Sequence, residues 1–227
     1  MPVILTILVL LALLIGPKYL ASNALRRHSA PREYLPGTGG ELAKNILSEL
    51  GLHEVKVELS AGPDHYDPET KTVRLGQNNL TGKSLTAVAV AAHEVGHAIQ
   101  DREGYAPLKT RATLLKFAQH IEKFGAMAMM AIPIIALSTR SPSVGLLTFI
   151  VGIASLGSSA LAHIVTLPVE FDASFNRALP ILKSGGYISE SEEKDVREIL
   201  RACAFTYVAG SLASLLNIWR WVAILRR

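Results

Sequence analysis

A His-Glu-x-x-His pattern lies near the middle of the chain, inside the apolar stretch 91–100. Alanine and valine surround the pattern and no proline interrupts it, which predicts a buried helix over residues 85–101. Residues four apart share one face of a helix, so His93 and His97 can present two imidazole nitrogens to a single metal ion. Glu94 follows the first histidine, in the position of a general base that deprotonates a metal-bound water. The pattern therefore predicts a helix that carries two zinc ligands and one catalytic carboxylate.

Long stretches without charged side chains constrain the rest of the chain. Residues 1–17, 141–169 and 202–219 contain no Asp, Glu, Lys or Arg, and 124–139 is a further charge-free run. Hydrophobic residues make up 49% of the chain and its mean hydropathy is +0.30, which is high for a soluble domain. These runs approach the length of a membrane span. We therefore expect a mainly α-helical integral membrane protein with about four transmembrane helices, and with a small α+β zincin-like catalytic domain between the first and second spans.

This pattern divides the chain into five expected parts. They are an N-terminal transmembrane anchor (1–20), a catalytic α+β region with the His-Glu-x-x-His helix (21–110), a transmembrane helical hairpin (111–168), a polar helical segment (169–201) and a C-terminal helix that is transmembrane or interfacial (202–227).

Within the polar region, local patterns predict individual elements. Thr38 is a candidate cap for a helix over 41–50, in which leucine and isoleucine recur at helical spacing. Residues 55–59 alternate as a strand does, and 72–75 read as its partner in one short β-hairpin. Ser84 is a candidate cap for the metal-site helix.

Charge and cysteine content limit the location and the partners. The net charge is +4, and no motif or mixture of basic and aromatic residues indicates nucleic-acid binding. Cys203 is the single cysteine, so no internal disulfide can form. Positive residues follow the first apolar stretch, which by the positive-inside rule places the catalytic region on the cytoplasmic side of the cell membrane; they are Lys18, Arg26, Arg27 and Arg32. The sequence gives no signal for an oligomeric state.

A catalytic zinc site needs a third protein ligand. The extended pattern His-Glu-x-x-His-x-x-Gly-x-x-His is excluded, because Gln100 and Glu103 occupy the positions of its glycine and third histidine. The segment 167–174 returns to the starting side of the bilayer after two expected spans, and Glu170 lies where it leaves the membrane. A carboxylate there is costly unless it is paired or coordinated, so we predict Glu170 as the third ligand. The alternatives are Asp172, His120 and His163.

The chain resembles the bacterial family of membrane-bound neutral zinc metallopeptidases. The segments that carry the resemblance are 65–68, 72–75, 91–100, 166–171 and 206–209. The resemblance implies a gluzincin-like site in which the zinc ligands are His93, His97 and Glu170 and the catalytic base is Glu94.

One position departs from the gluzincin pattern. Many gluzincins place an aspartate four residues after the ligand glutamate, where it holds a ligand histidine. Ser174 occupies that position here, so we expect Ser174 or Asp172 to take this role.

These observations predict a membrane-embedded metalloprotease that uses Zn²⁺ and a Glu94 general base to hydrolyse peptide bonds of polypeptides in or next to the lipid bilayer. A further group should donate to the developing oxyanion, and the candidates are Tyr207, His163 and Arg201. Two other functions are compatible with the sequence. One is a catalytically silent zinc-binding membrane scaffold, and the other is a carrier of small molecules or ions that depends on His163 rather than on Glu94.

Overall fold

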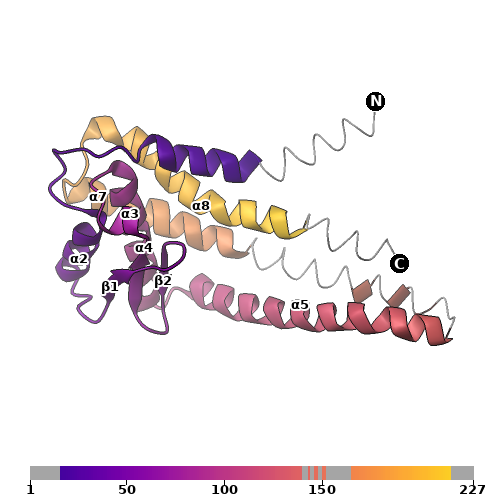
Figure 1. Ribbon diagram of the computed structural model, residues 1–227. Helices are drawn as coiled ribbons and strands as arrows, with labels where there is room; N and C mark the ends of the chain where they lie inside the picture. The colour runs from indigo at the N-terminus through magenta and orange to yellow at the C-terminus, as the bar shows by residue number, and fades with distance from the viewer. Residues whose placement is uncertain (1–15, 140–142, 144–145, 148–149, 152–164, 216–227) are drawn as a thin grey trace, which may run out of the picture.

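The computed structural model describes residues 16–139, 143, 146–147, 150–151 and 165–215 (Figure 1). A helix over residues 16–27 comes first, and helical residues 165–171 continue directly into a π-helical segment, η1. The named elements are α2 (Gly39–Glu49), β1 (Lys56–Leu59), β2 (His65–Asp67), β3 (Thr72–Leu75), α3 (Gln77–Leu80), α4 (Leu85–Arg102), α5 (Ala106–Thr139), η1 (Asp172–Ala178), α7 (Leu179–Ser184), η2 (Glu190–Glu192) and α8 (Glu193–Leu215).

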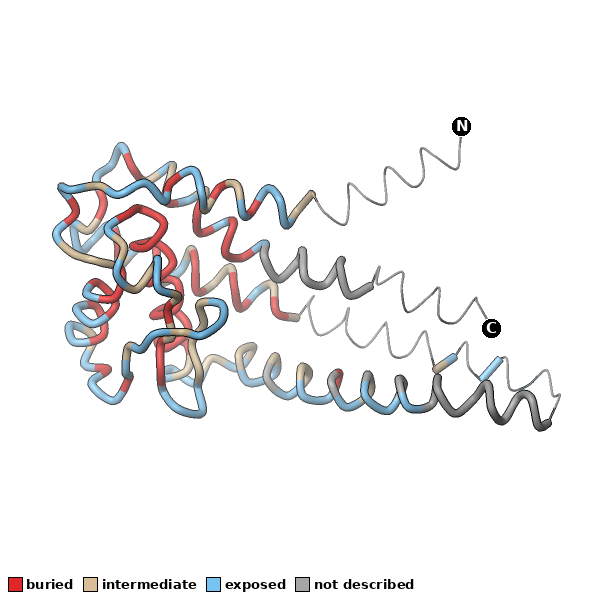
Figure 2. Tube along the Cα trace, viewed as in Figure 1, coloured by how far each residue is buried: buried red, intermediate tan, exposed pale blue. Residues whose placement is uncertain are grey.

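Helix α4 forms the centre of the compact part of the molecule. Every residue from Leu85 to Gln100 is buried, and the tube in Figure 2 is red along this helix. Elements α2, α3, α7, α8, η1 and two strands pack around it. Small alanine and valine side chains allow this close approach from several directions, which explains the composition of the stretch. The Ser84 hydroxyl accepts a hydrogen bond from the Ala87 amide at 3.1 Å, so the predicted cap of this helix is confirmed.

The predicted helix in the polar region is also confirmed, as α2. Thr38 and Glu41 form a reciprocal capping box: the Thr38 amide donates to Glu41 Oε2 at 2.7 Å, and the Glu41 amide donates to Thr38 Oγ1 at 3.2 Å. The buried side chains of α2, among them Leu42 and Ile46, lie in the same core as α4.

The prediction of a single β-hairpin was wrong. The described sheet has three strands in the order β1-β3-β2, and β1 pairs with β3 in parallel rather than as a hairpin partner. The antiparallel partner of β3 is β2, a three-residue strand in the segment expected to be a turn. A strand this short carries little alternation of polar and apolar side chains, which is why its pattern was not recognised. The actual turn lies just before β3, where Lys71 has a φ of 50°.

The predicted fold class with about four transmembrane helices was also wrong. Among the residues that the structure describes, no helix is both long enough and apolar enough to cross a membrane. The physical reason is visible in α5 and α8, because each carries charged side chains along its first half and is apolar only beyond it. The expected spans at 1–17 and 141–169 lie largely outside the described residues, and so do the last four residues of the stretch 202–219.

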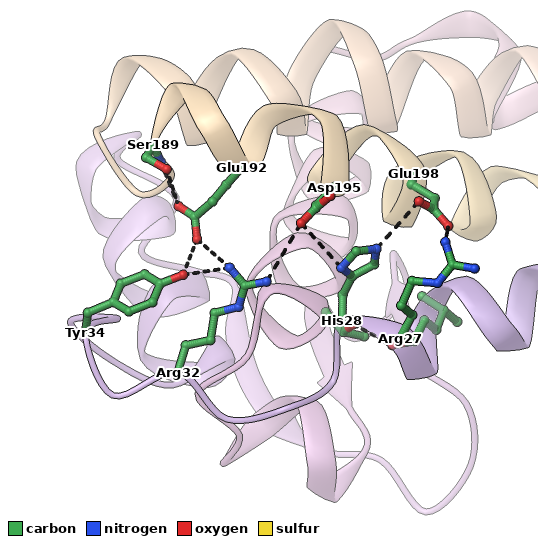
Figure 3. Close-up of polar contacts among 10 residues, drawn as sticks. Arg27, His28, Arg32, Tyr34, Ser189, Glu192, Asp195 and Glu198 are labelled. Atoms are coloured by element: carbon green, nitrogen blue, oxygen red, sulfur yellow. Dashed lines mark hydrogen bonds and ion pairs between the residues drawn. The ribbon is translucent and has the colours of Figure 1, made fainter.

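The N-terminal segment is joined to the start of α8 by a row of charges. Figure 3 shows basic side chains from residues 27–32 facing carboxylates of η2 and α8. The closest pairs are Arg27–Glu198 at 3.1 Å and Arg32–Glu192 at 2.9 Å, while His28 lies 3.6 Å from both Asp195 and Glu198. These contacts hold the segment that precedes α2 against the helix that packs on α4.

Candidate metal centre

The site lies where α4 meets the helical segment that ends in η1. His93 and His97 are one turn apart on α4, both are buried, and their ring centroids are 4.8 Å apart. Gly96 lies between them and lets the two segments approach closely, because a Cβ at this position would be 2.7 Å from the carbonyl oxygen of Ala173. Ala173 follows Glu170 by three residues, so this contact sets how near the carboxylate comes to the histidines.

Replacing Gly96 with alanine is expected to separate α4 from η1. The added methyl group meets backbone rather than a flexible side chain, and overpacking of this kind costs about 1–3 kcal/mol. Urea unfolding of the zinc-free protein should show this loss, and the affinity for zinc should fall because Glu170 moves away. Gly62→Ala is the matched control, since nothing lies within 4 Å of a Cβ built there. Equal stability and equal zinc affinity in both variants would contradict this account of the contact.

Three side chains converge on one point. Glu170 Oε2 lies 3.1 Å from His93 Nε2 and 3.4 Å from His97 Nε2, and the three donor atoms are within 4.8 Å of one another. The Glu170 side chain is fully buried. Ligands bound about 2.0–2.2 Å from a tetrahedral zinc ion lie about 3.3–3.6 Å apart. Both distances from Glu170 lie close to this range, and two imidazole nitrogens with one carboxylate oxygen are a donor set that suits zinc.

Each histidine is held by its other ring nitrogen. His93 Nδ1 lies 3.0 Å from Ser174 Oγ, and the Ser174 hydroxyl donates to the carbonyl oxygen of Leu200 at 3.2 Å. The hydroxyl hydrogen is thus engaged, so the serine oxygen accepts from His93 Nδ1–H. His97 Nδ1 contacts Gln100 Oε1 at 2.9 Å. Both rings therefore carry a proton on Nδ1, so each ring in its neutral form keeps the Nε2 lone pair for a metal ion.

The second oxygen of Glu170 contacts a cation. Arg111, on the first part of α5, donates from Nη1 to Glu170 Oε1 at 2.7 Å. Burial alone would raise the pKa of Glu170, but the two imidazoles outweigh it and hold the pKa well below its ordinary value. The carboxylate is thus ionised, with Oε1 on Arg111 and Oε2 directed at the histidines.

Glu94 has a different environment from Glu170. It is buried on α4 beside the first histidine, and this burial, with the nearby Glu170 and Asp64 carboxylates, raises its pKa to about 7. His93 and Arg111 partly oppose the shift. A carboxyl group whose pKa is close to neutral can both accept and return a proton, which is what a general base that later acts as an acid requires.

The structure brings together only some of the residues considered from sequence. Ser174 contacts a histidine directly, whereas Asp172 reaches His97 only through Gln100. His120 lies apart on α5 with Nδ1 on the Lys116 carbonyl. Of the three candidate oxyanion donors, Arg201 is exposed on α8, while His163 and the side chain of Tyr207 lie outside the described residues.

Sequence reasoning missed two residues of this site. Arg111 was treated only as the start of an apolar region, although a buried carboxylate implied that some cation must face it. Gln100 was used only to exclude a longer zinc motif, although it follows His97 by three residues on a helix and can therefore contact it.

Comparison with known proteins now identifies the family. The family described as "Putative neutral zinc metallopeptidase" matches residues 3–226, which is almost the entire chain. The chain belongs to this family. A curated relative from Bacillus subtilis (strain 168), named "Putative membrane protease YugP", is 38% identical over 195 residues, covering 82% of this chain and 80% of the relative. No solved structure matches. The resemblance inferred from sequence is thus confirmed, and a zinc metallopeptidase family accounts for the grouping of two histidines with a carboxylate.

Proposed function

We propose that this protein is a zinc metalloendopeptidase that hydrolyses peptide bonds of polypeptide substrates. The observation that carries the proposal is the convergence of His93 Nε2, His97 Nε2 and Glu170 Oε2, with Glu94 next to the first of them on the same helix. These three donors are the proposed zinc ligands and Glu94 is the proposed base. Family membership supports the reaction class.

The proposed mechanism follows from the side chains at the site. Zinc, when bound, lowers the pKa of a coordinated water and polarises the carbonyl group of the substrate. Glu94 accepts the proton of the attacking water at a carboxylate oxygen and then delivers it to the nitrogen of the leaving amine. Arg111 and the hydrogen bonds to both Nδ1 atoms hold the ligands in place. Tyr207 and His163 stay the proposed donors to the developing oxyanion.

The proposed location is the cell membrane, with the site on the cytoplasmic side. The name of the Bacillus subtilis relative supports the membrane location, and the positive residues near the N-terminus support the orientation.

Removal and return of zinc tests the proposed function. Casein proteolysis by the purified protein should stop after treatment with a chelator and recover when one equivalent of Zn²⁺ is added, because no described side chain replaces the Lewis acid. The Gln77→Leu variant, changed at an exposed position of α3, serves as a control and should behave as the wild type does. Zinc binding without proteolysis in the wild type would instead favour a catalytically silent metal-binding protein.

A further inference from the structure

Gln100, which contacts His97, is among the most enclosed polar side chains near the site. It is fully buried, one turn beyond His97 on α4. All of its amide interactions are short: Oε1 lies 2.9 Å from His97 Nδ1, and Nε2 lies 2.8 Å from both the Val169 carbonyl oxygen and Asp172 Oδ2. The side chain thus connects α4 with the turn that holds Glu170.

The partners of Gln100 determine which way its amide points. A backbone carbonyl oxygen and a carboxylate oxygen only accept hydrogen bonds, so both must face the NH₂ group of the amide. The amide oxygen is then left for His97, and it can only accept. His97 must therefore carry a proton on Nδ1, so a neutral His97 keeps its lone pair on Nε2, the ring atom that faces Glu170 and would bind a metal ion. If the amide were reversed, its NH₂ group would require the opposite tautomer of His97, with a hydrogen on Nε2.

Asp172 is itself held so that it can only accept. Arg177 donates from Nε to Asp172 Oδ2 at 2.7 Å, and Asn176 donates from Nδ2 to Oδ1 at 2.9 Å. Arg177 is in turn paired with Glu103, just beyond the end of α4, at 2.7 Å. Contacts thus run from Glu103 to Arg177 and Asp172, and from there to Gln100 and His97. This series begins and ends at α4 and passes through η1.

We propose that Gln100 is a positioning residue that selects the metal-binding tautomer of His97, with Asp172 fixing the orientation of its amide. This inference rests on the proposed function, since it assigns a role toward the zinc site. It gives the two histidines different supports. A serine hydroxyl that donates to a backbone carbonyl holds His93, whereas a neutral amide that donates to a carboxylate holds His97. The bond to the Val169 carbonyl also fixes the backbone next to Glu170, so Gln100 supports two of the three donors.

Zinc affinity of matched variants tests the role of Gln100. In Gln100→Leu, competition with a chromophoric chelator should give an affinity about 10–100-fold below that of the wild type, as is typical when a residue that orients a ligand is lost. The zinc affinity of Asp172→Ala should lie between those of Gln100→Leu and the wild type. This change keeps the Gln100 amide but removes the carboxylate that orients it. Gln77→Leu, the same change at an exposed position, should bind zinc as the wild type does. If Gln100→Leu does not fold, Asp172→Ala provides the test.

A second readout separates positioning from a general loss of structure. In the zinc-loaded protein with ¹⁵N-labelled histidine, both His93 and His97 should show a slowly exchanging Nδ1–H signal. In Gln100→Leu the His97 signal should be lost while that of His93, which depends on Ser174, persists. Unchanged zinc affinity and an unchanged His97 signal would overturn the role of Gln100 and leave the zinc site intact. A wild-type protein that binds no zinc would instead overturn the proposed function.

Discussion

Replacing Glu94 with glutamine is expected to lower kcat for casein proteolysis by about 10²–10⁴-fold while the protein keeps its zinc. Glutamine has nearly the same shape but cannot accept the proton of the attacking water. The proposed metal ligands are other side chains, so metal content should not change. The measurement combines steady-state proteolysis with metal analysis of the same preparation.

The control for Glu94→Gln is the exposed Glu69, whose side chain is 76% accessible and pairs only with a surface lysine in the described contacts. Glu69→Gln should leave both proteolysis and zinc content unchanged. If the Glu94 variant keeps the activity of the wild type, another group must be the base. If the Glu94 variant loses zinc together with activity, the role of Glu94 is in metal binding and not in proton transfer.

Replacing Glu170 with alanine is expected to lower zinc affinity by more than about 100-fold. The loss of a residue that only orients a ligand costs about 10–100-fold, so the loss of a ligand atom should cost more. The change removes the only carboxylate of the three-donor group and leaves Arg111 facing the two histidines. Metal analysis after dialysis against a weak chelator measures the effect, and proteolysis should fall with zinc occupancy.

The variants Glu170→Ala and Glu94→Gln thus separate a role in metal binding from a role in proton transfer. A loss of activity alone would not distinguish these roles. Addition of excess Zn²⁺ should restore part of the proteolysis in Glu170→Ala and none of it in Glu94→Gln. Full zinc occupancy in Glu170→Ala at the wild-type affinity would show that the third ligand is another residue.

The sequence predicted the centre of this molecule well because its signals there are local. The helix α4, its Ser84 cap and the shared face of His93 and His97 all follow from residues within one turn of each other. Glu170 was predicted by an argument from membrane spans that the described helices do not support, although the chain does bring it to the histidines. Its role as a ligand stays a prediction.

The sequence could not predict features that depend on contacts between distant segments. The parallel pairing of β1 with β3 joins strands that pack on different helices, since β1 contacts α2 and β3 contacts α4. The Arg111–Glu170 contact joins residues 59 positions apart. The π-helical turns of η1 place Asp172 beside Arg177, five residues later, and this spacing does not follow from an α-helical pattern.

The most direct test of the central claim is X-ray absorption at the zinc edge of the purified, zinc-loaded wild-type protein. We expect only nitrogen and oxygen ligands about 2.0–2.2 Å from the metal, with the scattering pattern of two imidazoles. The buried Cys203 thiol, whose burial raises its pKa above the ordinary value, should not contribute. A sulfur ligand at about 2.3 Å, or fewer than two imidazoles, would contradict the assignment of His93, His97 and Glu170 as the metal site.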